Sequence, residues 1–589
     1  MRLSRCLAVL LGLIAVSGST LDPTAARAAP NPAATMVVAV LADVDTLNPF
    51  VGTQATSTQI FRLTYDYLTD YSPADNSPVP ALALTWTTSA DGLTWTFHLR
   101  EGVHWSDGKP LTSKDVAFTY RTLMAHPTLA NSNQVHNFAS VETPDPATVV
   151  ITTKVPIPSM LTLDIPIAPE HLWAGHDPAT ELTGSAALVG SGPFRLLEAR
   201  QAGYYRFAAN TGYWRGSPKI DQLVLRYFTN SDTAVQSLRT GEVDVVAGLT
   251  PAQYDALADE RRITRNAAQY SRFTELGFNP GAARADGTAI GDGHPALRDV
   301  RVRQAIDQAI DRKALVERVL DGHGSPGVGY LPPTFAPWGW QPPPGALRTF
   351  DPAAANRALD QAGYRRGADG VRLMPDGKRR LSFNLLVPNG RPHYQQSATY
   401  LTGWLAAVGI EVKAQLMSDS EKGARVSTGR YDLFLGGWIL DPDPDFLLSV
   451  QTCDARPVGK ETGTTDTFAC DRTYDTLYQR QSQQIDREQR AGTVQQMQQR
   501  LYDDAELLTL YYPAVLEAYR GDRFAPLTRR PGGTGSIAGA WSYATAVPLA
   551  RPAPDGRSVP VLPLIALTLL VVLIGAAVWR SRATRDQRE

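Results

Sequence analysis

A regular alternation of apolar and polar residues over positions 93–100 is the clearest local pattern in the chain. Apolar side chains occupy every second position there, which predicts a β-strand with one buried face. A Ser-Asp-Gly turn follows at 106–108, where glycine is free to take a positive φ. Thr112 and Asp115 then stand at the spacing of a capping box, just ahead of an apolar-periodic run. The pattern therefore predicts a strand, a turn and a capped helix in this order.

Helix and strand patterns alternate through the second half of the chain. Apolar residues between 302 and 310 recur at the spacing of one helical face. Asp311 and Asp351 each precede a further helical pattern and are expected to cap it. Alternation of this kind predicts a mixed β-sheet flanked by helices. The other elements expected here are strands over 381–387 and 410–416 and a helix over 396–407.

Both ends of the chain carry hydrophobic runs. Residues 1–28 have a charged start, a short apolar stretch and an Ala-Arg-Ala cleavage site, which together predict a secretory signal peptide. The 21 residues of 559–579 carry no charge and would measure about 32 Å as a helix, which predicts a transmembrane helix. Four arginines follow in 580–589 and favour a cytoplasmic C-terminus. We therefore expect a single-pass protein of the cell membrane, anchored by its tail and extracytoplasmic for most of its length.

Composition narrows the range of partners and folds. A chain of 589 residues is too long for one core, so two or three lobes are expected. The 57 basic and 58 acidic residues nearly balance, and no basic patch suggests a nucleic-acid partner. Because Cys6 lies in the predicted signal peptide, Cys453 and Cys470 remain in the mature chain. A disulfide is the simplest expectation for two cysteines in an exported protein. A metal site is the weaker alternative, because two cysteines without a nearby histidine supply too few ligands.

Motifs for catalysis or cofactor binding are weak. Residues 322–327 fit GxGxxG, but they follow a helix instead of a strand, so a turn is favoured. Residues 441–445 resemble the start of a calcium loop, yet Phe446 replaces the required glycine and Thr452 the required glutamate. The sequence contains neither GxSxG nor HExxH. We therefore expect a protein that is not an enzyme and that uses no cofactor and no metal.

The segment 95–112, WTFHLREGVHWSDGKPLT, resembles the signature of the family 5 extracellular solute-binding proteins. These are the oligopeptide-, dipeptide- and nickel-binding receptors of bacterial ABC transporters. Residues 190–198 and 299–320 resemble further landmarks of the family. The resemblance implies an α/β fold of the two-lobed periplasmic-binding-protein type (class II), with mixed sheets flanked by helices and a ligand cleft between the lobes. It also implies two partners, a peptide or other small solute and the permease of an ABC transporter.

The resemblance and the hydrophobic runs together give the expected domain organisation. It consists of a signal peptide at 1–28, the first part of lobe 1 at 36–270, lobe 2 at 271–504, a return to lobe 1 at 505–545, a Pro-rich stalk at 546–558, the transmembrane helix at 559–579 and a cytoplasmic tail at 580–589.

Residues 431–448 resemble the cleft segment of the peptide-binding members of the family. In those proteins a tryptophan is followed three residues later by an aspartate, which pairs with the α-ammonium group of the peptide. Trp438 and Asp441 fall on these two positions, so Asp441 is the expected ammonium partner and Trp438 an aromatic wall. Gly437 would let a ligand chain approach the backbone closely. The alternative that Asp441 only begins an Asp-Pro turn and that Trp438 belongs to the core stays open.

Three other functions stay open at this point. The same fold could bind a non-peptide solute such as a metal chelate or an oligosaccharide, which would leave Asp441 without a role. A membrane-anchored surface hydrolase is disfavoured by the missing nucleophile motifs. A sensor would need a membrane partner, because the tail at 580–589 is too short for a signalling domain.

Overall fold

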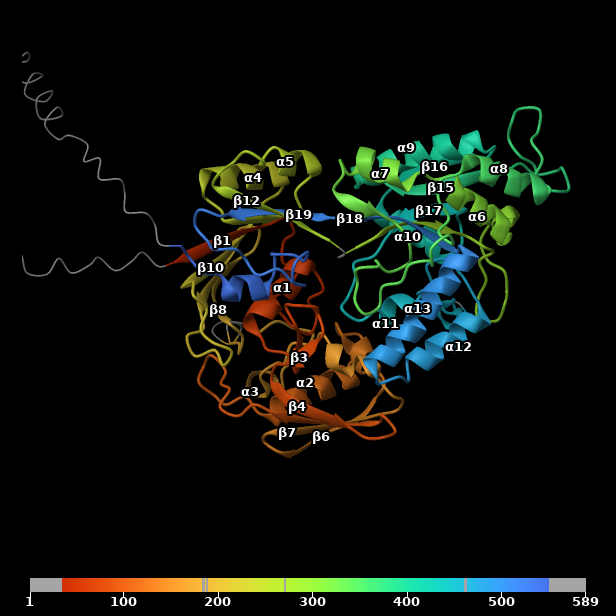
Figure 1. Cartoon of the computed structure of the whole chain (residues 1–589). Coiled ribbons are helices and arrows are strands. Elements are labelled where there is room, and N and C mark those ends of the chain that lie inside the picture. Colours follow the sequence, from red (N-terminus) through yellow and green to blue (C-terminus); the bar gives the residue numbers. More distant parts are fainter. Residues whose placement is uncertain (1–33, 183–185, 187–188, 270–271, 460–462, 550–589) are drawn as a thin grey trace, which may run out of the picture.

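The computed structural model describes residues 34–182, 186, 189–269, 272–459 and 463–549. Two lobes, each built around its own large β-sheet, stand side by side and are joined by the strands that cross between them (Figure 1). This arrangement confirms the predicted two-lobed α/β fold.

The first lobe contains a seven-stranded mixed sheet in the order β12-β19-β11-β1-β10-β9-β8. β1 is parallel to both of its neighbours, and the other pairings are antiparallel. Helices α4 and α5 cover one face of the sheet, while α1 and α14 pack on the other (Figure 1). The elements are β1 (Thr35–Val40), β8 (Phe194–Arg200), β9 (Tyr204–Ala209), β10 (Gln222–Tyr227), β11 (Val245–Ala247), β12 (Ile263–Ala268), β19 (Val515–Arg520), α1 (Ala55–Thr64), α4 (Ser231–Thr240), α5 (Pro251–Asp255) and α14 (Ala540–Thr545).

A four-stranded antiparallel sheet, β4-β5-β7-β6, forms the outer part of the first lobe. Its β5 is the predicted alternating strand, and Trp95 and Phe97 on its inner face are 2% and 0% exposed. The predicted capping box is confirmed, because the Thr112 side chain accepts from the start of α2 and the Asp115 side chain accepts from the Thr112 backbone N–H. The elements of this part are β2 (Thr69–Tyr71), β3 (Pro78–Pro80), β4 (Ala83–Thr88), β5 (Thr94–Leu99), β6 (Phe138–Asp145), β7 (Thr148–Thr153), α2 (Ser113–Ala125) and α3 (Glu170–Trp173).

The second lobe contains a six-stranded mixed sheet in the order β14-β18-β13-β17-β15-β16. Asp311 and Asp351 cap α7 and α8 with their side chains, as predicted. The helix expected over 396–407 begins earlier, at Pro392, because proline is favoured in the first helical turn. The elements are β13 (Thr274–Phe278), β14 (Gly324–Pro326), β15 (Ser382–Pro388), β16 (Glu411–Met417), β17 (Leu433–Gly436), β18 (Leu507–Pro513), α6 (Val300–Gln308), α7 (Arg312–Val319), α8 (Pro352–Gln361), α9 (Pro392–Ala407), α10 (Asp419–Ser427), α11 (Asp445–Ser449), α12 (Arg472–Gln481) and α13 (Arg487–Asp504).

The chain passes between the two large sheets at β12 to β13 and again at β18 to β19. β18 pairs with β13 and β14 of the second sheet, and β19 pairs with β11 and β12 of the first. The return to the first sheet therefore falls at Ala514, so β18 lies in the second sheet although the predicted organisation begins the return at 505. The lobe limits themselves stay a prediction.

The predicted C-terminal transmembrane helix needs correction. Within the described ranges, no helix is both long enough and apolar enough to cross a membrane. That prediction depended on hydropathy, which measures the apolarity of a run and does not by itself establish a helix. The predicted span at 559–579, the signal peptide at 1–28 and the tail at 580–589 lie outside the described residues. Because the single-pass localisation depended on this helix, it is corrected as well. The two-lobed α/β part of the fold prediction is unaffected.

Cys453 and Cys470 form a disulfide, as predicted. The bond joins the turn after α11 to the residue before Asp471, which caps α12. The described part of the chain contains no group of three or more His, Cys, Asp or Glu residues able to hold a metal ion.

Candidate ligand-binding cleft

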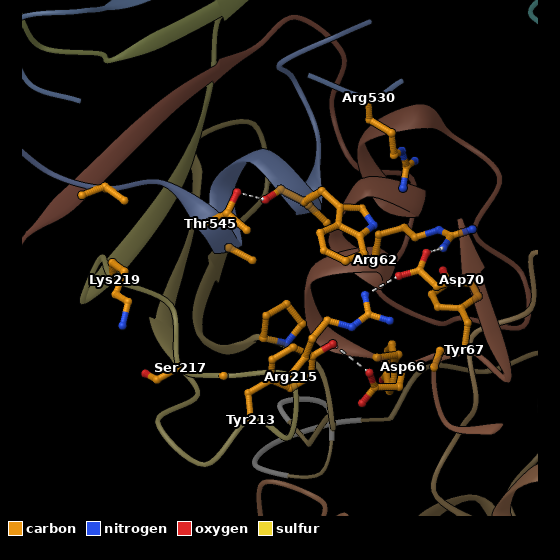
Figure 2. A pocket seen from close by; sticks show the side chains of 18 residues that line it. Arg62, Asp66, Tyr67, Asp70, Tyr213, Arg215, Ser217, Lys219, Arg530 and Thr545 are labelled. Carbon is orange, nitrogen blue, oxygen red and sulfur yellow. Dashed lines mark hydrogen bonds and ion pairs between the residues drawn. The ribbon is translucent and has the colours of Figure 1, made fainter. Parts of the chain in front are cut away.

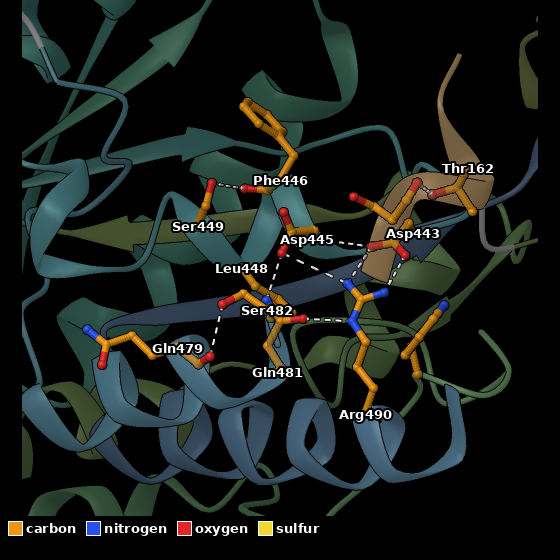
Figure 3. Close-up of polar contacts among 12 residues, drawn as sticks. Thr162, Asp443, Asp445, Phe446, Leu448, Ser449, Gln479, Gln481, Ser482 and Arg490 are labelled. Atoms are coloured by element: carbon orange, nitrogen blue, oxygen red, sulfur yellow. Dashed lines mark hydrogen bonds and ion pairs between the residues drawn. The ribbon is translucent and has the colours of Figure 1, made fainter. Parts of the chain in front are cut away.

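Residues 437–445 connect β17 to α11 in the second lobe and contain three aspartates separated by prolines. Asp443 binds the Arg490 guanidinium through two contacts of 2.5 and 2.7 Å, and the Arg490 side chain is 3% exposed. Asp445 accepts a hydrogen bond of 2.7 Å from the Gln481 amide. Figure 3 shows Arg490 reaching from α13 toward Asp443, with Asp445 and Gln481 beside it. These two aspartates therefore fix the segment to the helices beneath it.

Asp441 differs from both of its neighbours. Its carboxylate has no hydrogen bond and no ion pair with any described residue, and the side chain is exposed. Nevertheless, the pKa of Asp441 is raised to about 6, first because surrounding protein displaces water and then because of the negative charges of Asp164 and Asp443. Asp164 belongs to the first lobe, so Asp441 faces that lobe across the space between the two. An unpaired carboxylate among other carboxylates favours a positively charged ligand group.

Trp438 lies half-buried on the same segment. Its indole Nε1 donates a hydrogen bond of 2.7 Å to Asp466, and its ring packs edge-on against Phe446 with centroids 5.6 Å apart. One edge of Trp438 also packs against the core formed by α12, α13 and their neighbours. The ring is therefore partly in the core and partly accessible, and its role as an aromatic wall for a ligand stays a prediction.

The backbone packing around position 437 explains why a glycine is found there. A Cβ atom added to this residue would lie 2.0 Å from the carbonyl oxygen of Phe273, which is too close for any side chain. The adjacent backbone continues the contact, because Arg272 and Ile439 form a β-bridge. Glycine is therefore required here by the close approach of two chain segments, whether or not a ligand also contacts this backbone.

Two buried carboxyl groups lie behind Trp438, and sequence reasoning missed both. Asp466 accepts the indole hydrogen bond, and burial raises its pKa to about 6. Glu275 in β13 is 1% exposed, and burial followed by the charge of Asp466 raises its pKa well above the ordinary value. The polar Glu275 within the otherwise uncharged TELGF strand was the available signal. A protonated Glu275 beside an ionised Asp466 avoids two adjacent buried charges.

A positively charged group also lies near the segment. Arg272 pairs in the backbone with Ile439, two residues before Asp441. Burial and then the charge of Arg391 lower the pKa of Arg272. Burial, Arg391 and Arg272 lower the pKa of His393 to about 4, so these three side chains share one neighbourhood. Sequence reasoning missed this group because Arg272 lies more than a hundred residues before Arg391 and His393 in the chain.

The two lobes touch on either side of this region. Near the crossing strands, His323 of the second lobe contacts the Asp255 carboxylate of the first at 3.0 and 3.1 Å. Farther from those strands, Ile485 packs against the first-lobe core beside Gly92. The space faced by Asp441 is therefore bounded by both lobes.

Comparison with known proteins gives consistent matches. A model of the bacterial extracellular solute-binding proteins, family 5 (Middle), matches residues 77–456. Protein XP55 of Streptomyces lividans is 33% identical over 422 residues, which cover 71% of this chain and 72% of that protein. Di/tripeptide-binding protein 2 of Pseudomonas aeruginosa is 26% identical over 503 residues, covering 79% of this chain and 88% of that protein.

A solved structure supports the same fold. The oligopeptide-binding protein AppA from Bacillus subtilis, in complex with a nonapeptide, superposes with a TM-score of 0.67 at 22% identity. The alignment covers 88% of this chain and 100% of that one. At this identity the likeness establishes the two-lobed fold and leaves the choice of ligand to the chemistry of the cleft.

Proposed function

The chain belongs to the bacterial extracellular solute-binding proteins of family 5, and we propose that it binds peptides between its lobes through their free amino end. Proteins of this family are binding receptors of ABC importers and not enzymes, so the protein partner is a permease. The observation that carries the peptide assignment is the unpaired carboxylate of Asp441.

A peptide α-ammonium group matches this carboxylate. In a cleft from which water is displaced, a cation needs a charged hydrogen-bond partner, and such a bond contributes about 1.5–3 kcal/mol. The charges of Asp164 and Asp443 add to the negative potential around Asp441. Asp443 is already paired with Arg490 and Asp164 with Arg62, so Asp441 is the carboxylate of the three with free capacity for a ligand.

The basic group formed by Arg272, Arg391 and His393 favours a peptide over a simple amine. A peptide carries a carboxylate as well as an ammonium group, and the guanidinium groups of Arg272 and Arg391 are suitable partners for a carboxylate. Because Arg272 bridges to Ile439, acidic and basic groups meet on one short stretch of the second lobe. We propose that Trp438 supplies an aromatic wall between them and that the backbone at Gly437 borders the ligand.

The sequence predicted lobes of residues 36–270 with 505–545, and 271–504; because β18 pairs within the second sheet, we propose that the return to the first lobe begins at Ala514. A ligand that touches both lobes favours the closed arrangement only by its higher affinity for that arrangement. We propose that the contacts at His323 and Ile485 limit this closure on either side of the ligand.

The test compares Asp441→Asn with the parent protein by calorimetric titration of a bound peptide, first identified by mass spectrometry of co-purified material. Asparagine keeps the size of the side chain and removes its charge, so the fold should be retained. Affinity for peptides with a free amino end should fall by about 2–4 kcal/mol, because the buried ammonium group loses its partner. The N-acetylated peptide should bind the parent weakly and lose little more in the variant.

Asp259→Asn is a matched control, because Asp259 is an exposed aspartate of the first lobe. This variant should bind both peptides like the parent. Equal affinity of Asp441→Asn and the parent for the free peptide would leave Asp441 as a turn residue and remove the support for recognition of the amino end.

A further inference from the structure

A pocket of about 410 Å³ lies within the first lobe, and one of its wall residues, Arg62, pairs at 2.5 Å with Asp164, which faces the cleft. Its walls come from α1, the residues around β2, the loop after β9 and α14 (Figure 2). Neither Trp438 nor Asp441 lines it, and its wall comes from the first-lobe segments together with Val547, which follows α14. A volume of this size is within the usual range for small-molecule sites.

Four cationic side chains and two carboxylates line the pocket. Asp70 is bound by Arg62 at 3.3 Å and by Arg215 at 2.7 Å. One oxygen of Asp66 accepts hydrogen bonds from Tyr213 and Trp214 at 3.0 and 3.1 Å. Asp70 is therefore engaged through both oxygens, whereas the second oxygen of Asp66 is buried without a hydrogen-bond partner in the described part of the chain. The four cationic groups still outnumber the two carboxylates.

Arg530 and Lys219 supply the excess. Among the residues that the structure describes, neither side chain has a carboxylate within 4.0 Å or donates a hydrogen bond. Burial, followed by the charge of Arg62, lowers the pKa of Arg530. The charges of Asp70 and Asp164 act on Arg530 in the opposite sense, but neither carboxylate is paired with it, so an anionic ligand would stabilise this guanidinium group. In Figure 2 Arg530 stands at one end of the pocket and Lys219 at the other.

The rest of the lining is largely aromatic and aliphatic. Tyr65, Trp541, Pro193 and Val547 form apolar walls between the two cations. The Trp541 indole N–H is buried and has no acceptor in the described part of the chain. An inorganic anion would leave most of this apolar surface uncovered, whereas an organic anion with an apolar body would cover it.

We propose that this pocket is a second binding site for a small organic carboxylate with an apolar body, whose carboxylate pairs with Arg530. The site goes beyond the proposed function and does not depend on it, because the peptide is assigned to the cleft. Arg215, stacked at 4.4 Å over the Trp541 ring and held by Asp70, stabilises the wall.

The probe is 3-phenylpropionate, titrated calorimetrically into the purified full chain. Two controls separate its features: 3-phenylpropanamide has nearly the same shape without the charge, and acetate has the charge without the apolar body. We expect 3-phenylpropionate to bind at least tenfold more tightly than either control. No heat of binding at millimolar 3-phenylpropionate, or equal binding of the amide, would overturn the proposal.

Variants locate the site. Arg530→Gln should weaken 3-phenylpropionate binding at least tenfold, and Lys219→Gln, an exposed rim change that leaves packing intact, should weaken it two- to threefold. Arg318→Gln, on the surface of the second lobe, is the matched control and should bind like the parent. Asp441→Asn should also retain the binding. Loss of binding in Asp441→Asn with retention in both pocket variants would place the probe in the cleft and refute the second site.

Discussion

Replacement of Arg490 by methionine tests how the cleft segment is held. Arg490 donates to the Asp443 carboxylate at 2.5 and 2.7 Å and to the side-chain oxygen Oε1 of Gln481 at 2.8 Å. The Arg490 and Asp443 side chains are only 3% and 10% exposed. Methionine keeps much of the apolar stem, so the main effect is a buried Asp443 without its cation. Loss of one partner from a buried pair costs about 3–5 kcal/mol.

Hydrogen exchange is the suitable assay, because the chain has two lobes and global unfolding need not be two-state. The opening free energy of α11 and of α13 should fall by about 3–5 kcal/mol in Arg490→Met, up to the global stability of the lobe. Arg472→Met is the control, since Arg472 is 78% exposed in its pair with Asp475. That variant should lose at most about 1 kcal/mol.

A double variant separates the cause from general damage. Asp443→Asn combined with Arg490→Met removes the unpaired charge, so part of the lost free energy should return. A loss below about 1 kcal/mol in Arg490→Met would show that the pair is solvated like a surface pair. In that case Asp443 would not be what holds Asp441 toward the first lobe.

Two further predictions concern the disulfide and the pH dependence of binding. Replacement of Cys453 and Cys470 by serine should lower the free energy of unfolding by about 3 kcal/mol, because the bond closes a loop with a sequence separation of 17. Urea denaturation measures this change. Unchanged stability would mean that the loop is already constrained in the denatured chain. Peptide affinity should be highest near pH 7 and fall up to tenfold per pH unit below 6, because the pKa of Asp441 is about 6 in the free protein and an ammonium partner favours its ionised form. It should fall again above about pH 8, where the α-amino group of the free peptide loses its proton. Calorimetry between pH 4.5 and 7.5 checks the fall at low pH, and a parent protein with the same pH profile as Asp441→Asn would contradict the assignment.

Local structure was largely determined by the sequence itself. The strand at 94–99, the capping box at Thr112 and the caps at Asp311 and Asp351 all follow from side-chain periodicity and from hydrogen bonds between residues a few positions apart. The disulfide followed from the number of cysteines in a chain predicted to be exported. Such features depend on neighbours along the chain, so one sequence is enough to predict them.

Only the tertiary structure decided which charged groups are free. Asp441, Asp443 and Asp445 look equivalent in the sequence, yet Asp443 is neutralised by Arg490, 47 residues away, while Asp441 has no partner among the described residues. Glu275 and Asp466 meet behind Trp438, although they lie on separate segments of the second lobe. The free energy of a charge depends on the water and counter-charges around it, which are set by residues far away in the chain. Hydrophobic periodicity predicts which face of a helix or strand is buried, but it does not predict which charged side chains will pack beside that face.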